Sequence, residues 1–469
     1  MGNTPIVQTL IELSRQEKIS LHMPGHKQGQ RPGFLAGWLG EALQYDQTEI
    51  GSLDSLHSPA GPIRQAESLV AELYGTKATY FTTNGSTAGL IASLLASASP
   101  GAEVIVPRNA HKAVLAGIIL ADLLPRFVTP AYHGGYELGI TAASLQAALE
   151  QYPQAQAVVL LSPTYEGVTG DLAQLVSLAK AAHCNVIVDE AHGAHFLFHP
   201  CMPLSAVCTQ ADWVVQSAHK TLTALTGAAW VHRLNDNFAD DWLRSRLNLV
   251  QTTSPSWLIL GSLDIAQYEL RRNGRTWLER AVEQASQLRQ AILQHTPFSI
   301  WTVPSTGSYK QDPLKIVVQT TGSGYTGYEL ARYLEDHGIF VEMAKAQGIL
   351  LMLTLADTKL PTELLVRCLN SLPRRHPQTR DSLPPPPPAP PLVLSPRSAY
   401  LAPTSCVDAA AAAGRIAARA VYAYPPGSPL IYPGELIERE LLVYVDEFRA
   451  RGGYLTGLQE DTWVVVAEN

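Results

Sequence analysis

The sequence has few cysteines, few charged residues and no long apolar run. The 469 residues include five cysteines, which form no CxxC motif and are odd in number, so they cannot all pair. This argues against a disulfide scaffold and favours a reducing compartment. The most apolar stretch, AVLAGIILADLLP at 113–125, is interrupted by Asp122 and is too short to span a bilayer. The start, MGNTPIVQTLIELSRQEKI, has acidic residues and no apolar segment of signal-peptide length. We therefore expect a cytoplasmic protein without a membrane partner.

Nucleic acid and nucleoside triphosphates are disfavoured as ligands. Charged residues make up 16% of the chain and the formal net charge is −7, which argues against nucleic acid and leaves a cationic small substrate plausible. The phosphate-loop pattern GxxxxGK[ST] is absent, so DEAH at 189–192 lacks the partner that a helicase box needs. His192, His195 and His199 follow no recognised zinc spacing, and we expect no metal.

A run of prolines divides the chain. Residues 384–391, PPPPPAPP, favour extended polyproline II over helix or sheet, so we interpret them as a spacer. The alanine-rich stretch beyond it, DAAAAAGRIAARAV, is a helix candidate. The domains that we expect are an N-terminal segment at 1–70, a major domain at 71–265, a small α/β domain at 266–372, a proline-rich linker at 373–394 and a C-terminal domain at 395–469.

The major domain alternates between short apolar runs and stretches of helical length. AEVIVP, QAVVLLSP, CNVIVDE and ADWVVQS read as buried strands, while TAGLIASLLASA and LAQLVSLAKAAH read as helices. This alternation of strands and helices predicts a mostly parallel sheet with helices on both faces. In such sheets ligands bind beyond the carboxyl ends of the strands, so the residues that follow each run should be considered together.

The strand ends carry the parts of a pyridoxal phosphate (PLP) site. Lys220 lies just past an apolar run, where a buried ammonium needs a partner, and it can form an imine with the cofactor's aldehyde. Asp189 can face the pyridine nitrogen and keep it protonated. Gly85–Thr87, at the start of a predicted helix, and Ser217 can surround the phosphate. Asp189 and Lys220 are 31 residues apart, about one strand–helix–strand unit, so adjacent strand ends can hold both.

Seven short motifs resemble those of one enzyme family. They are PGHKQG at 24–29, TTNGST at 82–87, RNAHK at 108–112, SPTYEG at 162–167, VDEAHGAH at 188–195, SAHKTL at 217–222 and TTSPSW at 252–257. Together they resemble the ornithine/lysine/arginine decarboxylases, which have the aspartate-aminotransferase-like fold (PLP fold type I). The resemblance covers about residues 3–265 and resumes at YPPGSPLIYPGE.

The resemblance implies roles for individual residues around PLP. His111 would stack on the ring, Asp189 would pair with its nitrogen, His192 would lie near the phenolic oxygen, and Lys220 would hold the cofactor covalently. The residues implied around the phosphate are Gly85, Ser86, Thr87, Ser217 and His219. In this fold the site lies at a dimer interface, so Ser254 or Thr253 is expected to reach the partner's phosphate in a homodimer with a shared active site.

The implied reaction is decarboxylation of a basic amino acid, in which Lys220 or His219 protonates Cα. Arginine to agmatine is the leading expectation, followed by lysine to cadaverine and ornithine to putrescine, in polyamine metabolism. Glu49, Asp54 and Glu435 are candidate partners for the basic side chain. A PLP-dependent aminotransferase or an oxoamine synthase of the same fold is the alternative, and a non-catalytic protein remains open if no imine forms at the lysine.

Two features depart from the longer members of the family. PGHK begins only 24 residues into this sequence, which places the chain with the short form that has no N-terminal receiver-like domain. We therefore do not expect the large assemblies of the long form, although an oligomer beyond the dimer stays open. His192 stands where the long members carry a bulky aromatic residue.

Overall fold

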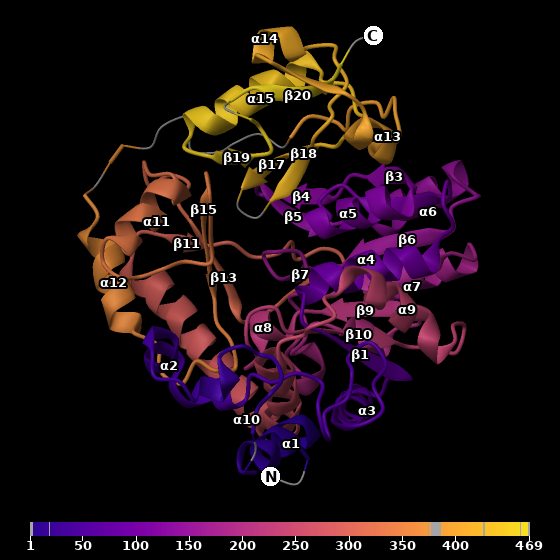
Figure 1. Ribbon diagram of the computed structural model, residues 1–469. Helices are drawn as coiled ribbons and strands as arrows, with labels where there is room; N and C mark the ends of the chain where they lie inside the picture. The colour runs from indigo at the N-terminus through magenta and orange to yellow at the C-terminus, as the bar shows by residue number, and fades with distance from the viewer. Residues whose placement is uncertain are drawn as a thin grey trace.

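A seven-stranded sheet forms the centre of the molecule (Figure 1). The computed structural model describes residues 3–17, 19–373, 375–376, 386–424, 427–459 and 461–467. The strands of the sheet, in spatial order, are β1 (Ala78–Thr82), β10 (Ala229–Arg233), β9 (Trp213–Gln216), β8 (Asn185–Asp189), β6 (Ala157–Leu161), β2 (Glu103–Pro107) and β3 (Leu124–Val128). Only β10 runs antiparallel to its neighbours in this sheet, which confirms the predicted mostly parallel architecture.

Helices cover both faces of the central sheet. The helices against the sheet are α4 (Gly85–Ser97), α5 (Lys112–Ala121) and α9 (Asp240–Val250) on one face, and α6 (Ala142–Gln151) and α7 (Leu172–Ala181) on the other. Successive strand residues point to opposite faces, so Ile187 packs with α4 while Val186 and Val188 pack with α7. Because both faces are buried, the strands read as continuous apolar runs in the sequence.

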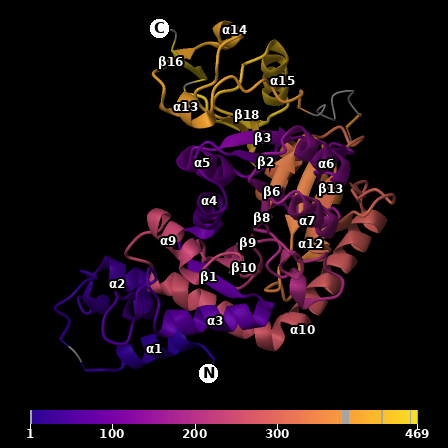
Figure 2. The same cartoon turned by 90° about the vertical axis from the view of Figure 1, so that its right-hand side faces the viewer.

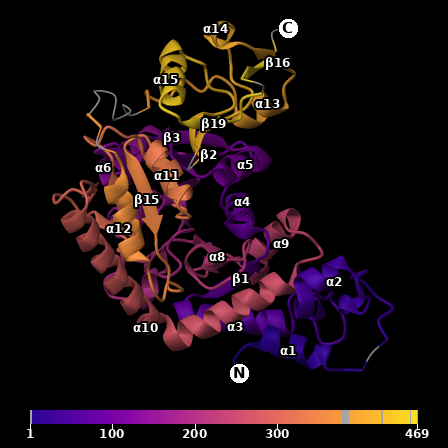
Figure 3. The same cartoon turned by 90° about the vertical axis from the view of Figure 1, so that its left-hand side faces the viewer.

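A long helix joins the major domain to the small domain. Helix α10 (Trp257–His295) packs against α1 (Pro5–Ser14) and α3 (Pro62–Tyr74) near its start and beneath a second sheet near its end (Figure 3). That sheet is antiparallel, with the order β11 (Ser299–Ile300), β13 (Lys315–Gln319), β15 (Gly348–Met352) and β14 (Met343–Lys345). Helices α11 (Gly327–Glu335) and α12 (Thr362–Ser371) complete this part. The boundary predicted at 265–266 falls within α10, which is continuous there.

The C-terminal domain sits over the carboxyl ends of β2 and β3 (Figure 2). Its strands are β16 (Thr404–Val407), β17 (Val421–Tyr424), β18 (Ser428–Ile431), β19 (Tyr454–Thr456) and β20 (Trp463–Val466), and its helices are α13 (Pro396–Leu401), α14 (Ala409–Ala412) and α15 (Arg439–Ala450). Of the predicted spacer, residues 386–391 form neither helix nor strand, and residues 384–385 lie outside the described residues.

The prediction of a helix over the alanine-rich stretch is wrong for most of its length. The structure forms only the four-residue α14 there, and Gly414 turns the chain with a φ of +81°. Beyond this turn, Ile416 and Ala417 form β-bridges to Leu436 and Val465. Ala410 and Ala411 are exposed, whereas Ala412, Ala417, Ala418 and Ala420 are buried small residues that let these segments approach closely, and this packing outweighs the helix propensity of the stretch.

Shorter elements connect these parts. They are α2 (Phe34–Leu39), α8 (Ala218–Thr221), β4 (Ala131–His133), β5 (Tyr136–Gly139), β7 (Val168–Thr169), β12 (Lys310–Gln311) and the 3₁₀ turns η1 (Lys27–Gly29), η2 (Gly40–Gln44), η3 (Phe196–Phe198) and η4 (Ala206–Cys208). Among the described residues, no helix has both the length and the apolar character that crossing a bilayer requires.

Candidate active site

Two neighbouring strand ends bring Asp189 and Lys220 into one cavity. Asp189 is the last residue of β8 and is paired in register with Val215 of β9, while Lys220 follows β9 in the short helix α8. A cavity of about 60 Å³ at this edge is lined by both of them and also by Ser86, His111 and His192. Residues from four separate strand–helix connections therefore meet at the carboxyl edge of the sheet, where parallel sheets bind ligands.

Asp189 is a buried carboxylate near the half-buried amine of Lys220. Its exposed fraction is 3%, and its Oδ1 accepts a hydrogen bond from the Ala191 amide at 3.1 Å. Burial raises the pKa of Asp189, and the positive charge of Lys220 opposes that rise. Burial likewise lowers the pKa of Lys220, while Asp189 raises it. A carboxylate in such surroundings fits a protonated ring nitrogen, because a buried charge is stable only next to an opposite charge.

The start of α4 and the end of β9 provide small polar groups. Ser217 Oγ donates to Ser86 Oγ at 2.9 Å, so the two hydroxyls from the predicted phosphate cradle touch. Gly85 opens the helix with a φ of +71°, a conformation that glycine adopts without strain. Thr87 is exposed. Of the residues predicted around the phosphate, only Ser86 lines the 60 Å³ cavity, and Gly85, Thr87, Ser217 and His219 do not. The hydroxyls and the N-terminus of α4 suit a phosphate group.

His111 presents a neutral ring to the cavity. It caps α5, where its Nδ1 accepts a hydrogen bond from the Ala113 amide at 3.2 Å. Burial, with the nearby charges of Lys220 and Lys112, lowers the pKa of His111 to about 4. The imidazole is therefore uncharged at neutral pH, and an uncharged flat ring fits the predicted stacking on the cofactor.

His192 lies between two lysines, one of which the sequence reasoning missed. Its Nε2 is 3.2 Å from Lys220 Nζ, and its Nδ1 is 3.2 Å from Lys315 Nζ. A neutral imidazole has one donor and one acceptor nitrogen, so one of these two amines must be uncharged to accept a hydrogen bond. Lys315 is 1% exposed, and burial lowers its pKa to about 8. The sequence signal that could have identified Lys315 is its position inside the apolar run PLKIVV, because a buried ammonium there needs a partner, as it does at Lys220.

The histidines considered as metal ligands have other contacts. His195 Nε2 lies 3.1 Å from Asp312 Oδ2 in a buried contact between the major and small domains, which is an ion pair when the imidazole is protonated. His199 Nδ1 accepts from the Cys201 amide at 3.3 Å. Within the described part of the chain, no group of three or more potential ligands could hold a metal ion.

The structure does not bring the predicted substrate carboxylates into the cavity of Lys220. Asp54 accepts hydrogen bonds from the amides of Ala60, Gly61 and Ile63 at the start of α3, and Glu49 is exposed. Glu435 is fully buried and pairs with Arg108, with 2.8 Å between Nη2 and Oε2, so it holds the C-terminal domain on the major domain.

Ser254 is exposed, and its contact with a partner subunit stays a prediction.

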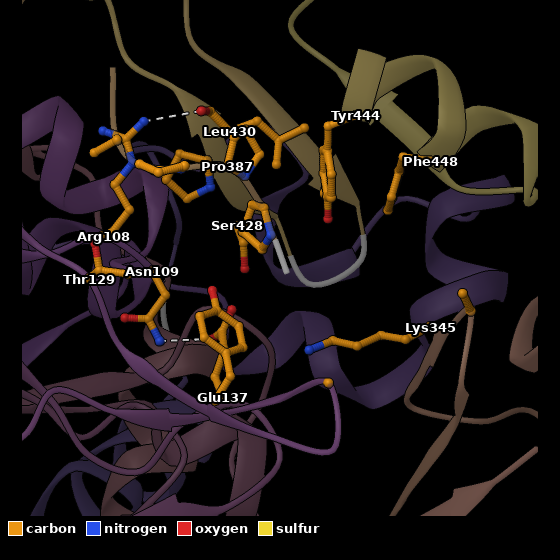
Figure 4. A pocket seen from close by; sticks show the side chains of 18 of the residues that line it. Arg108, Asn109, Thr129, Glu137, Lys345, Pro387, Ser428, Leu430, Tyr444 and Phe448 are labelled. Atoms are coloured by element: carbon orange, nitrogen blue, oxygen red, sulfur yellow. Dashed lines mark hydrogen bonds between the residues drawn. The ribbon is translucent and has the colours of Figure 1, made fainter. Parts of the chain in front are cut away.

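Glu137 is a second residue that sequence reasoning missed. It lies on β5 and lines the 60 Å³ cavity together with Lys220 and Asp189. It also lines an adjoining cavity of about 420 Å³, shown in Figure 4. The only sequence signal was an acidic residue in the otherwise apolar strand YELG.

Comparisons with known proteins agree with this geometry. The family description "Orn/Lys/Arg decarboxylase, major domain" matches residues 4–360, and the C-terminal domain of the same family matches residues 389–468. An arginine decarboxylase of Bacillus subtilis is 34% identical over 98% of this chain and 96% of its own length. The constitutive lysine decarboxylase of Escherichia coli is 24% identical over 94% of this chain and 76% of its own length.

Solved structures identify the fold. The structure of that lysine decarboxylase superposes with a TM-score of 0.85 at 20% identity, covering 98% of this chain and 81% of the other. A serine palmitoyltransferase of S. paucimobilis with bound PLP gives 0.51 at 16% identity over 65% and 74% of the two chains. The predicted PLP fold type I architecture is confirmed. Strand-end chemistry, fold and sequence lead to one conclusion: the chain belongs to the ornithine/lysine/arginine decarboxylase family of enzymes.

Proposed function

We propose that this chain decarboxylates arginine to agmatine with PLP held at Lys220, and that it acts more weakly on lysine and ornithine. The main observation in support is that Lys220 and Asp189, which lie at the ends of neighbouring strands, line the same cavity. The relative of higher identity is named an arginine decarboxylase, which favours arginine over lysine. Family membership favours decarboxylation over the aminotransferase and oxoamine synthase alternatives. The product amines are those of polyamine metabolism.

The residues that line the cavity, together with Ser217 beside Ser86, fit the needs of this reaction. When bound, PLP supplies an electron-withdrawing ring that takes up the electron pair left on Cα as CO₂ departs. Asp189 would hold the proton on the ring nitrogen, His111 would pack on the ring, and Ser86 with Ser217 would bind the phosphate. Leu161, Pro163 and Tyr165 give part of the wall an apolar surface, which would limit the access of water to the bound substrate and strengthen the charge interactions inside.

Lys220 is better placed than His219 to return a proton to Cα. Lys220 Nζ lies in the cavity next to His192, and burial lowers its pKa, which favours release of a proton from the amine. The ring of His219 instead points its Nδ1 at the Ala228 carbonyl, 2.9 Å away. We therefore assign the proton transfer to Lys220 and a positioning role to His219.

A product assay tests the proposed function. The purified chain with PLP is supplied with arginine, lysine and ornithine in turn, and released CO₂ and amine are measured. We expect agmatine from arginine, with a kcat/KM at least about tenfold above that for lysine or ornithine, because side-chain length and head group both change. A keto acid in place of CO₂ and amine would establish an aminotransferase instead, and a higher kcat/KM on lysine would reject arginine as the main substrate.

We further propose that the chain acts as a homodimer in the cytoplasm. The N-terminal segment exposes large apolar side chains, among them Phe34 at 91% and Trp38 at 73%, and monomers rarely leave such a surface uncovered. The resemblance around Ser254 adds the expectation of an active site shared between subunits. All five cysteines are unpaired thiols, which suits a reducing compartment.

Light scattering tests the dimer. We expect the native chain to be dimeric at micromolar concentration and the double substitution Phe34→Ser with Trp38→Ser to raise the dissociation constant more than about tenfold, since two large apolar side chains would leave the interface. Leu401→Ser, an exposed apolar position on α13 at the opposite end of the molecule, is the matched control and should leave the mass unchanged. A monomeric native chain would reject the proposal.

A further inference from the structure

The cavity of Lys220 opens onto a larger cavity at the junction of three domains. This space of about 420 Å³ shares Asn109, Glu137 and Ser428 with the 60 Å³ cavity. Its walls come from the major domain, from β14 of the small domain, and from β18 and α15 of the C-terminal domain (Figure 4). A substrate bound at Lys220 therefore has room for its side chain in one direction, and that direction passes Glu137.

Glu137 is oriented by two neighbours from different domains. Its Oε2 accepts a hydrogen bond from Asn109 Nδ2 at 2.7 Å, and Ser428 also hydrogen bonds to the carboxylate. The side chain lies within the pocket and is only 8% exposed (Figure 4). A carboxylate has about four lone-pair positions, so these two donors leave capacity for a third partner.

The charges around this junction do not cancel. Glu166 is fully buried and pairs with Lys345, and Glu435 pairs with Arg108, which leaves the carboxylate of Glu137 without its own cation. Lys345 points toward Glu137 in Figure 4 but is bound to Glu166, whose Oε2 has no hydrogen-bond partner among the described residues. With these carboxylates ionised, the group carries one excess negative charge in a poorly hydrated place. A cation from outside the chain would balance it.

Four aromatic side chains contribute to the wall of the large cavity. Tyr132, Tyr328, Tyr444 and Phe448 line it, and Figure 4 shows Tyr444 and Phe448 across the space from Glu137. Aromatic faces attract ammonium and guanidinium groups, and they also pack against the methylene stems of long basic side chains. The same cavity thus offers an apolar path and a negative end.

We propose that Glu137 binds the cationic end of the substrate side chain and so selects basic amino acids. This inference rests on the proposed function, because it places the reacting end of the substrate at Lys220. Burial raises the pKa of Glu137, the charge of Lys345 lowers it, and the charge of Glu166 raises it again. An arriving guanidinium or ammonium stabilises the ionised carboxylate and releases the repulsion with Glu166.

The decisive comparison is between arginine and citrulline, which differ in charge but little in shape. In Glu137→Gln we expect kcat/KM for arginine to fall roughly 10- to 100-fold, mainly through KM, because one charge-assisted hydrogen bond is lost. The preference for arginine over citrulline should shrink by a similar factor. The absorbance of the bound cofactor should match that of the native chain. Glu103→Gln, on β2 in an ion pair with Arg126 outside both cavities, is the matched control and should change none of these values.

A binding measurement separates this inference from the proposed function. Agmatine binding is followed by calorimetry, which needs no turnover, and should weaken roughly 10-fold or more in Glu137→Gln. If the native chain turned over no basic amino acid, the proposed function would fail while this binding result still decided the role of Glu137. Unchanged agmatine affinity together with an unchanged arginine-to-citrulline ratio would overturn the inference.

A second variant tests the inference even if the Glu137→Gln chain does not fold. Glu137→Asp keeps the negative charge but withdraws it by one methylene. We expect it to keep the preference for arginine over citrulline while raising KM for arginine severalfold, on the order of one weakened hydrogen bond. A folded Glu137→Asp chain with the native KM would contradict direct contact between this carboxylate and the substrate.

Discussion

Replacement of Lys220 by alanine should reduce decarboxylation by at least about 10⁴-fold, because the proposed function assigns both the covalent attachment and the proton transfer to this one amine. The variant should also lose the visible absorbance that a lysine-bound cofactor gives. Both quantities are measured on the purified chain with added PLP, by CO₂ release and by absorption spectroscopy. Lys77→Ala, an exposed lysine paired with Asp236, is the matched control and should keep native activity.

Contacts of Lys220 make the result interpretable. The Lys220 amine touches His192 and lies near Asp189, so its removal leaves a buried carboxylate without its nearest cation. Some loss of stability will therefore accompany the loss of activity, and the melting temperature of the variant must be measured alongside. An alanine variant that kept both turnover and the lysine-bound absorbance would refute the assignment of Lys220.

Substitution of Asp189 by asparagine should reduce kcat about 10²- to 10³-fold while PLP binding is largely retained. The amide keeps the size of the side chain but cannot hold a proton on the ring nitrogen, so the electrostatic stabilisation of charge on Cα is lost. Burial makes this loss larger than in water, because only 3% of Asp189 is exposed. Rates are compared at saturating PLP, with cofactor content determined for each preparation.

Glu190 offers the contrasting substitution one residue along the chain. Its carboxylate accepts from Ser205 Oγ, the Ala206 amide and Gln216 Nε2, and it does not line the cavity of Lys220. Glu190→Gln should therefore lower the melting temperature without changing kcat per folded molecule, since a buried acceptor is replaced by a donor. Equal kcat values for Asp189→Asn and the native chain would remove Asp189 from the reaction.

The cofactor end of the site was readable from sequence because local patterns define it. Parallel strands are buried on both faces and so appear as apolar runs, and the residues just after them meet at one edge. That rule placed Ser86, His111, Asp189, His192 and Lys220 together, and the structure brings these five residues into one cavity. The mostly parallel sheet follows from the same pattern.

The proposed substrate end depends on contacts between distant parts of the chain, and sequence reasoning missed it. Lys315 and Glu137 reach the site only because the small domain and the β4–β5 hairpin fold back over the sheet. Glu435 looked available in the motif YPGE, but its interaction with Arg108 crosses 327 residues of sequence. Hydrophobic periodicity reports on local secondary structure and does not predict contacts between distant residues. The sequence signals for these residues were therefore limited to isolated charged residues within apolar strands.

The split origin of the site has an evolutionary consequence. The strand ends proposed to surround PLP belong to the central sheet, whereas Tyr444 and Phe448, which line the larger cavity and not that of Lys220, lie beyond the proline spacer. Mutations in that last portion can alter which molecule is accepted without disturbing the machinery that performs the reaction. Duplicated genes could thus diverge in preference through changes after position 386 while inheriting the same chemistry intact.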